Sequence, residues 1–237
     1  WRLGGEDEPA GFLNLTCFTV PVEKIKEKSK EKNVTVTQYL CAVMMMALQN
    51  LQKERVKNIL KRKPIKVLIP VNLRKLFNSN TLRNFVLYTT PEIETKLGQY
   101  SFDEILKVIV CKMGQDITEK QMVKKITTNV ESEEMLAVKL LPLFIKNIVM
   151  KAVFDAVGER TACLSLSNLG KIQVPENMQK YIERFDFILG VQASAPYNCG
   201  VLAYNDTIYI NFIRNLKQPY LEMAFHQVLM ELGIQAT

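Results

Sequence analysis

Two short polar segments follow buried strand patterns, and their side chains are of types that can do chemistry. In the first, the apolar pattern that begins at Ile69 ends in a loop carrying Asn72 and Arg74, and the next strand pattern opens with Asn84. Functional side chains often gather at strand ends, and an arginine can hold a carboxylate through two parallel hydrogen bonds. The segment therefore indicates either a carboxylate-binding arginine or a loop arginine in water.

The second segment, 164–170, combines hydroxyl and amide side chains with a glycine. Strand alternation places Ser165 and Ser167 on one face, and Asn168 and Gly170 then break the strand pattern. A hydroxyl at the mouth of a sheet can donate a hydrogen bond to a developing oxyanion. Because serine, asparagine and glycine also favour turns, an ordinary turn remains the alternative.

Histidine chemistry is restricted, because the 237 residues contain one histidine, His226. It lies in a helical pattern with Leu229 and Met230 three and four positions further on, so no carboxylate follows on its face of the helix. A zinc site built from two or three imidazoles cannot form within this chain. We expect His226 to be structural, and histidine-dependent catalysis to need a histidine from another chain.

The cysteines and the common catalytic motifs exclude further classes of site. The five cysteines form no C-x-x-C pair and are odd in number, which argues against a zinc ribbon, a redox site or a secreted disulfide framework. The sequence also lacks a phosphate loop, a G-x-G-x-x-G turn and a G-x-S-x-G nucleophile elbow. We therefore expect no metal site, and a reducing cytoplasmic location.

The elements that would position these residues alternate between strands and helices. Strand patterns cover residues 12–20, 66–71, 82–92, 162–167, 187–193, 199–204 and 207–214. Helical patterns cover 22–32, 37–53, 101 to beyond 113, 131–155 and 219–232. No repeat or Pro/Gly/Ser linker divides the chain, so we expect one α/β domain over 1–237, a mixed sheet flanked by helices.

Local signals refine several of these elements. Thr35 or Thr37 can cap the second helix, and Ser101 with Glu104 fits a capping box. Pro142 lies inside the pattern over 131–155 and is expected to kink it. The methionines at 44–46 suit the filling of irregular gaps in a core.

The positive charge is concentrated in residues 23–75, which hold 14 Lys and Arg against four Glu. Such a segment could meet nucleic acid, anionic lipid or a phosphorylated small molecule. No aromatic residue stands between Lys24 and Lys32, so the stacking element of a single-strand binder is missing there. We favour a solvated lysine-rich surface and expect no nucleic-acid partner.

Membrane insertion is not indicated. The longest apolar runs, 39–48 and 140–149, are about ten residues each, roughly half of a membrane span. The first residues lack the pattern of a signal peptide, and the chain starts at Trp1 without an initiator methionine. The sequence is therefore expected to be a piece cut from a longer protein, with residues 1–20 holding its first strand.

Five segments, taken in order, resemble the C-terminal half of the chloramphenicol acetyltransferase-like superfamily, which includes alcohol O-acetyltransferases and peptide-synthetase condensation domains. The best match is to the alcohol acetyltransferase type, and the resemblance covers the chain from about residue 35 onwards. The segments are Thr35–Leu48, Pro70–Arg74 (similar to P-V-[DN]-L-R), Arg83–Phe85 (similar to G-N-F), Tyr100–Leu106 and Ser167–Gly170 (similar to S-N-L-G).

The resemblance implies roles for particular residues. Ser167 would stabilise the oxyanion, and Arg74 would pair with the aspartate of a His-x-x-x-Asp motif whose histidine is the general base. Asn168, Asn72 and Asn84 complete the substrate-binding set, with Asn72 and Asn84 fixing loop and strand geometry. The His-x-x-x-Asp motif belongs to the N-terminal half of the family's fold and is missing here, so the chain alone is expected to be inactive.

The function that the resemblance implies is acyl transfer from acyl-CoA to an alcohol, with this chain shaping one wall of the substrate tunnel. Acyl-CoA would be a co-substrate rather than a bound cofactor, and the N-terminal half of the parent protein would be the partner. Two alternatives remain: a non-catalytic binding module of the same fold, and a fragment of a condensation domain.

Overall fold

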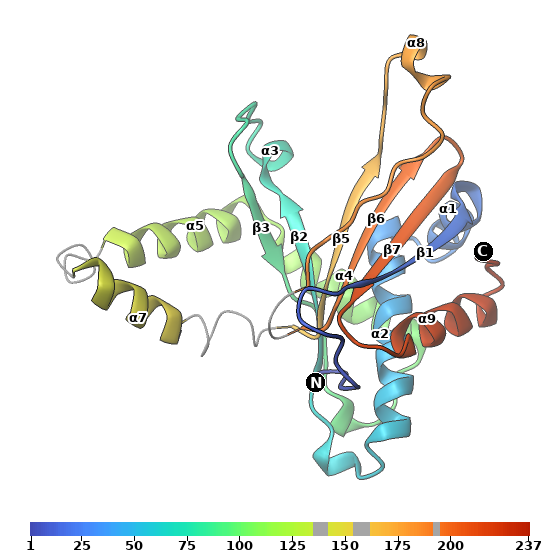
Figure 1. Ribbon diagram of the computed structural model, residues 1–237, viewed down its shortest axis with the longest axis horizontal. Helices are drawn as coiled ribbons and strands as arrows, with labels where there is room; N and C mark the ends of the chain where they lie inside the picture. Colours follow the sequence, from blue (N-terminus) through green and yellow to red (C-terminus); the bar gives the residue numbers. More distant parts are fainter. Residues whose placement is uncertain (135–141, 154–161, 192–194) are drawn as a thin grey trace.

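The computed structural model describes residues 1–134, 142–153, 162–191 and 195–237. Its centre is a mixed sheet in the order β1-β7-β6-β5-β2-β3, with β4 paired to β2 (Figure 1). The strands are β1 (Asn14–Pro21), β2 (Ile65–Asn72), β3 (Val86–Thr89), β4 (Glu92–Ile93), β5 (Leu164–Lys171), β6 (Tyr197–Tyr204) and β7 (Thr207–Arg214). The expectation of a mixed sheet flanked by helices is confirmed.

The helices gather mainly on one face of this sheet, where α2 is covered by α4 and α9 (Figure 1). They are α1 (Val22–Glu31), α2 (Val36–Arg55), α3 (Leu73–Leu76), α4 (Phe102–Asp116), α5 (Glu119–Glu134), α7 (Leu143–Val153), α8 (Glu176–Gln179) and α9 (Tyr220–Glu231), with short 3-10 turns at Ile59–Lys61 and Thr95–Leu97. Among the described residues, no single helix is long and apolar enough to cross a membrane, although α1 and α2, bent by 87°, pass that length and composition test together.

The start of α2 is fixed by a capping box. The Thr35 side chain accepts a hydrogen bond from Gln38 N at 3.3 Å, and Gln38 Oε1 accepts one from Thr35 N at 2.8 Å. These bonds satisfy backbone donors that have no partner within the helix. The structure thus selects Thr35 over Thr37 as the cap. Met44 and Met45 are fully buried in α2, which confirms them as core residues.

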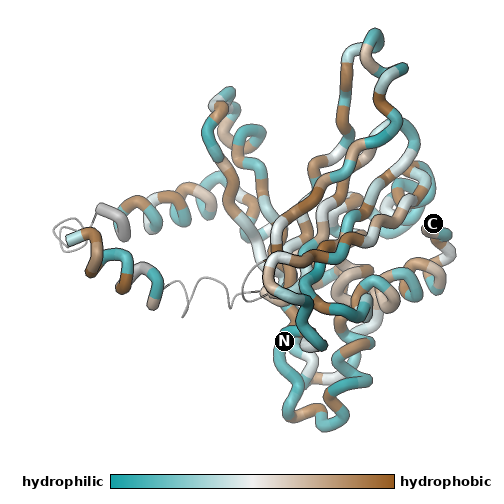
Figure 2. The backbone as a smooth tube through the Cα atoms, viewed as in Figure 1, coloured by the Kyte–Doolittle hydropathy of each residue, from teal (hydrophilic) through white to brown (hydrophobic). Residues whose placement is uncertain are grey.

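The two faces of the sheet differ in chemistry. Leu164 and Leu166 of β5, with Cys199 and Val201 of β6, belong to the core that packs on the helices. In Figure 2, hydrophobic residues recur along these central strands. The alternating residues point to the opposite face, which we call the helix-free face, and they include Ser165, Ser167, Asn198 and Asn211.

The sheet is narrowly joined at its centre. The parallel pairing of β2 with β5 consists of Val67 with Leu164 and Leu68 with Ser165. Beyond these pairs β2 continues only beside β3, and β5 only beside β6, so the two parts of the sheet separate (Figure 1). We call this junction the seam. Ser167 lies on β5 just past the seam.

Residues 182–190 cross the helix-free face over β6, and we call them the strap. The ring of Phe185 packs edge-on against Tyr204 with centroids 4.9 Å apart, and Asn198 Nδ2 donates to Gly190 O at 2.5 Å. Between these anchors the strap lies so close to Gly200 that a Cβ atom there would stand 2.1 Å from Phe187 O. The absence of a side chain at Gly200 is therefore required for the strap to pack.

A buried ion pair ties α9 to the sheet. Arg214 Nη1 of β7 lies 2.6 Å from Glu222 Oε1, in the first turn of α9, and both side chains are nearly inaccessible to solvent. Thr16 of β1 accepts a further hydrogen bond from Arg214 Nη1 at 3.0 Å. Burial raises the pKa of Glu222, and the neighbouring guanidinium opposes that rise.

Two of the expected strands need correction. The strand expected over 82–92 is two short strands, β3 and β4, because Pro91 between them lacks a backbone N–H. Residues 187–191 form no strand, since side chains supply the backbone partners in the strap, and 192–194 lie outside the described residues.

The helix expected over 131–155 is also wrong as a single kinked element. Pro142 directly precedes α7 instead of lying inside a helix, a position where its missing N–H costs nothing. The expected apolar residues Leu136, Leu140 and Leu141 lie outside the described residues. The polar helix α5, which begins at Glu119, was not anticipated over most of its length.

We predict that Gly200→Ala lowers the free energy of unfolding by about 1–3 kcal/mol, because the added methyl group meets a backbone carbonyl that cannot rotate away. The matched control is Gly114→Ala in α4, where nothing lies within 4 Å of the new Cβ and helix propensity favours alanine by about 0.5–1 kcal/mol. Urea unfolding measures both variants. Equal effects of the two substitutions would contradict the close approach of the strap.

Candidate functional site

Arg74 organises the loop that joins β2 to β3. Asn72, the last residue of β2, caps the short helix α3 by accepting a hydrogen bond from Arg74 N at 3.1 Å. The guanidinium then reaches across the loop, with Nε donating to Thr81 O at 2.8 Å and Nη2 donating to Arg83 O at 2.6 Å. These bonds fold residues 77–85 back onto α3. Arg74 is therefore a structural clamp for this loop and is not a freely solvated side chain.

The clamp leaves part of the guanidinium available. An arginine carries five N–H groups, and the bonds to Thr81 O, Arg83 O and Asn72 Oδ1 (3.3 Å from Arg74 Nη1) use three of them. The two remaining N–H groups, one on each terminal nitrogen, suit a carboxylate. A single Arg74 side chain can thus hold the loop and an incoming acid together.

Asn84 is exposed beside this loop. The sequence predicted that it opens a strand, but β3 begins two residues later, at Val86. The next residue, Phe85, packs its ring 5.7 Å from that of Phe77, which secures the loop at its base. Asn72 and Arg74 therefore form one cluster with the loop, and Asn84 lies at its exposed edge.

Ser167 lies on the helix-free face of β5, half-buried, opposite Gly200 of β6. In the part of the chain that the structure describes, its hydroxyl has no hydrogen-bond partner. On its other side β2 has already separated from β5 at the seam. The Ser167 hydroxyl is thus available to donate a hydrogen bond to a ligand at the place where β5 and β2 separate.

Asn168 points the other way, because adjacent residues of a strand face opposite sides. Its Nδ2 donates to Thr37 Oγ1 in the first turn of α2 at 3.1 Å, and its Oδ1 accepts from Gly170 N at 2.8 Å. It lines a cavity of about 300 Å³ between β5, β6 and the start of α1. The structure therefore places Ser167 and Asn168 on opposite faces of the sheet.

His226 is partly buried and structural, as the sequence predicted. Its ring stacks on Phe18 with centroids 5.7 Å apart, and Nε2 lies 3.4 Å from Ala236 O. This position is on α9, on the face of the sheet opposite to Ser167. Among the described residues, no group of three or more His, Cys, Asp or Glu could hold a metal ion.

Sequence reasoning did not single out the polar residues beside Ser167. Asn198 and Asn211 are 3% and 0% exposed, and both lie on the helix-free face within apolar strand patterns. The available signal was the glycine at position 200, because a glycine inside a strand pattern marks a close backbone approach. Only the fold identifies what approaches, which is the strap.

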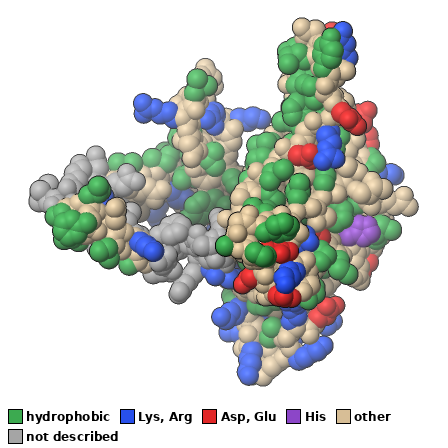
Figure 3. Space-filling model, in the orientation of Figure 1, with side chains coloured by type: hydrophobic (Ala, Val, Ile, Leu, Met, Phe, Trp, Pro, Cys, Tyr) green, Lys and Arg blue, Asp and Glu red, His purple; other side chains and the backbone are tan. Residues whose placement is uncertain are grey.

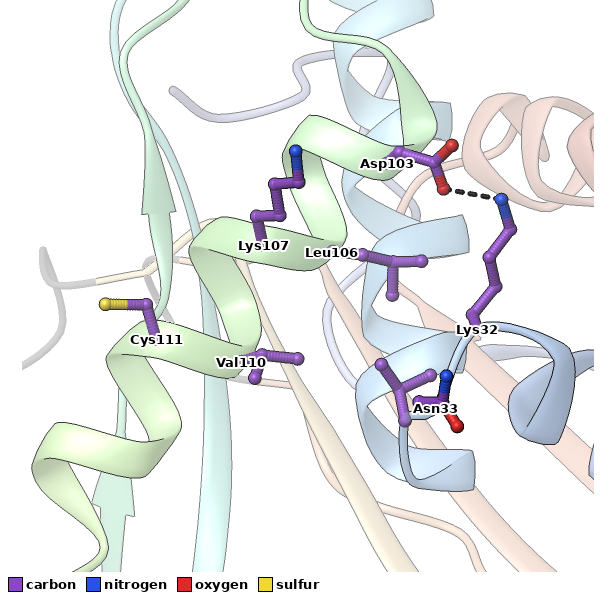
Figure 4. Close-up of a pocket in the computed structure, with 8 residues that line it drawn as sticks. Lys32, Asn33, Asp103, Leu106, Lys107, Val110 and Cys111 are labelled. Carbon is purple, nitrogen blue, oxygen red and sulfur yellow. Dashed lines mark hydrogen bonds and ion pairs between the residues drawn. The ribbon is translucent and has the colours of Figure 1, made fainter.

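Other cavities lie away from these residues, and two of them are lined by basic side chains. A groove of about 490 Å³ separates α4 from the turn after α1, where Leu106 and Val110 form an apolar wall and Lys32 reaches Asp103 at 2.6 Å (Figure 4). A cavity of about 820 Å³ at the lower end of the sheet is lined by Lys61, among other basic residues. Lys and Arg side chains also gather at this end in Figure 3.

The fold agrees with that of known acyltransferases. The chain resembles trichothecene 15-O-acetyltransferase from Fusarium sporotrichioides (TM-score 0.63, 13% identity), covering 97% of this chain and 48% of that protein. It also resembles a wax ester synthase/diacylglycerol acyltransferase from Marinobacter aquaeolei VT8 (TM-score 0.51, 14% identity, 96% and 51% coverage) and the nonribosomal peptide synthetase FmoA3 (TM-score 0.58, 12% identity, 98% and 24% coverage). The chain thus spans about half, or less, of the proteins it resembles.

These likenesses define the class of the fold, an acyltransferase fold shared with peptide synthetases. The sequence identifies the family within that class. The family model of alcohol acetyltransferases matches residues 10–182, and the chain belongs to this family. No curated protein sequence matches it.

We predict that Arg74→Ala lowers the free energy of unfolding by about 1–2 kcal/mol, because the carbonyls of Thr81 and Arg83 lose charged hydrogen bonds at a half-buried site. Amide hydrogens of residues 77–85 should exchange faster than in the unaltered protein. Lys75→Ala, next to it and exposed, is the control and should change neither quantity. Unchanged exchange in the Arg74 variant would contradict the clamp.

Proposed function

We propose that this chain is the C-terminal half of an acyltransferase that moves an acyl group from acyl-CoA to an alcohol. The observation that carries the proposal is the Ser167 hydroxyl, which has no partner in the described chain and lies where the sheet opens at the seam. The membership of residues 10–182 in the alcohol acetyltransferase family supports the reaction class. The half-length match to full acyltransferases supports the division into halves.

In this reaction the alcohol oxygen attacks the thioester carbonyl while a general base removes its proton. The carbonyl oxygen becomes an oxyanion, and the Ser167 hydroxyl donates a hydrogen bond to it. The carbon–sulfur bond then breaks, the carbonyl reforms, and the CoA thiolate leaves and takes up a proton. Ser167 stabilises charge only in the transition state, so its effect falls on kcat.

A histidine general base would come from outside this chain. His226 is held against Phe18 on the helix side of the sheet, away from Ser167. We assign the base to a His-x-x-x-Asp motif in an N-terminal half of the parent protein. The two N–H groups that Arg74 keeps beyond its own loop would pair with the aspartate of that motif and hold it in place.

The helix-free face offers a surface for such a half. Val86, Tyr88 and Leu15 are about half exposed there, and hydrophobic side chains spread over the strands and the strap in Figure 3. Half-exposed apolar side chains on both edge strands would suit contact with a further domain. An N-terminal half packed on this face would enclose Ser167 and exclude water from the reaction.

The test is to co-express the chain with the upstream half of its parent protein and assay acyl transfer from acetyl-CoA to a series of alcohols. Ser167→Ala should lower kcat by about two orders of magnitude and leave the melting temperature unchanged. The control is Thr127→Ala, which removes a hydroxyl from an exposed position of α5 and should leave kcat unchanged. A folded complex without transfer activity would overturn the proposal.

A non-catalytic binding module is the second candidate, and the observation in its favour is that His226, the one histidine of the sequence, lies on the face of the sheet opposite to Ser167. It predicts that the complex binds an alcohol or acyl-CoA without turnover. Calorimetry on the complex used in the activity assay separates the two candidates, because only the first predicts that bound acyl-CoA is consumed.

A further inference from the structure

The strap is held on the sheet by an amide that serves two elements at once. Asn198 Oδ1 accepts a hydrogen bond from Ser165 N of β5 at 2.9 Å, and Asn198 Nδ2 donates to Gly190 O of the strap at 2.5 Å. The side chain is 3% exposed. Because both amide atoms are used and shielded from water, the distance between β5 and the end of the strap is fixed by one side chain.

A second asparagine anchors the middle of the strap. In the amide orientation that satisfies both groups, Asn211 Oδ1 accepts from Phe187 N at 2.9 Å and Nδ2 donates to Asp186 Oδ1 at 3.3 Å. Arg184 pairs with the same carboxylate at 2.8 Å. Within the described ranges the strap pairs with no strand, so these side chains take the place of a backbone ladder.

The two asparagines that hold the strap belong to two neighbouring rows of paired residues across β5, β6 and β7. Ser165 stands opposite Asn198, and two residues further on Ser167 stands opposite Gly200, which in turn pairs with Asn211. The carbonyl of Phe187 fills the space that a side chain at Gly200 would occupy. The strap is therefore the neighbour of Ser167 on the β6 side, while the seam leaves the β2 side open.

We propose that Asn198 is a positioning residue for Ser167, and that the strap it holds forms the wall beside the reacting carbonyl. The inference rests on the proposed role of Ser167 as oxyanion donor. By holding Ser165 N, Asn198 fixes the direction of β5 immediately before Ser167. By holding Gly190 O, Asn198 also fixes the distance between the strap and the Ser167 hydroxyl. The hydroxyl and the strap therefore keep the same relative position.

The chemistry of the position explains why an amide is needed. The site requires one acceptor, for Ser165 N, and one donor, for Gly190 O. Aspartate keeps the acceptor and loses the donor, and alanine loses both and leaves two buried backbone groups unpaired. Asn198→Asp therefore removes only the hydrogen bond to Gly190 O of the strap, and Asn198→Ala also removes the one to Ser165 N of β5.

The activity test uses the co-expressed complex. Asn198→Ala should lower kcat by about tenfold to a hundredfold with little change in the KM for acyl-CoA, since a misplacement of about 1 Å has that effect on a catalytic group. A residue that acts only through Ser167 gives a non-additive pair, so Ser167→Ala/Asn198→Ala should be no slower than Ser167→Ala alone. Losses that multiply in the double variant, or a change confined to KM, would overturn the inference.

An activity-independent measurement keeps the inference testable if the complex shows no transfer, which would overturn the proposed function alone. Amide exchange followed by NMR on this chain should show Ser165 and Ser167 exchanging about tenfold faster in Asn198→Ala, with β2 amides unchanged. In Asn198→Asp, Ser165 should stay protected while strap amides exchange faster. Asn129→Ala, at an exposed position of α5, is the matched control. Unaltered exchange at Ser165 in the alanine variant would overturn the role of Asn198.

Discussion

The structure depends on the narrow parallel pairing of β2 with β5. Two residue pairs join the strands that carry the Arg74 loop to the strands that carry Ser167. Parallel strands in α/β proteins are stabilised by helices on their faces, and here α2 packs beneath the junction. Because the pairing stops early, the sheet stays continuous in its core and opens toward one end. An opening of this kind gives a substrate access to strand residues without breaking the core.

One face of the sheet is packed in the apolar core, and the other carries the polar residues of the candidate site. On the helix side, Leu164 and Leu166 are buried in the core that packs on the helices, which holds the strand in place. On the other side, the same strand presents Ser165 and Ser167 to a small polar network of asparagine amides and strap backbone. Since a strand alternates its side chains, rigid packing of one face aims the residues of the other. Asn168, one step along, is accordingly part of the packing of β5 on α2.

Local signals in the sequence predicted much of this fold. The capping box at Ser101 gave a correct helix start, and Thr35, one of the two caps that the sequence offered for α2, is the one found. The strand patterns over 199–204 and 207–214 are also found, as β6 and β7, with a turn at Asn205 between them. These features depend on neighbours within about four residues. The family resemblance rested on such segments too, and the alcohol acetyltransferase family is confirmed.

Features set by distant contacts were not predictable in the same way. The apolar residues from Phe187 onwards read as a strand, yet their backbone partners are side chains of β6 and β7, which no local pattern encodes. The helix α5 is a different case, because Met122, Ile126 and Val130 recur four residues apart, so its sequence carried an amphipathic signal that the prediction missed. For the site, the family resemblance assigned roles to both Ser167 and Asn168, whereas the strand places their side chains on opposite faces of the sheet.

The pairing of β1 with β7 has a consequence for co-translational folding. Asn14 of β1 lies opposite Arg214 of β7, so β1 leaves the ribosome long before its partner has been translated. Residues 9–22 carry no charged side chain, and such a strand edge is prone to pair with other chains. Until β7 has been translated, β1 is therefore an uncharged segment without its β7 partner, of the kind that chaperones shield.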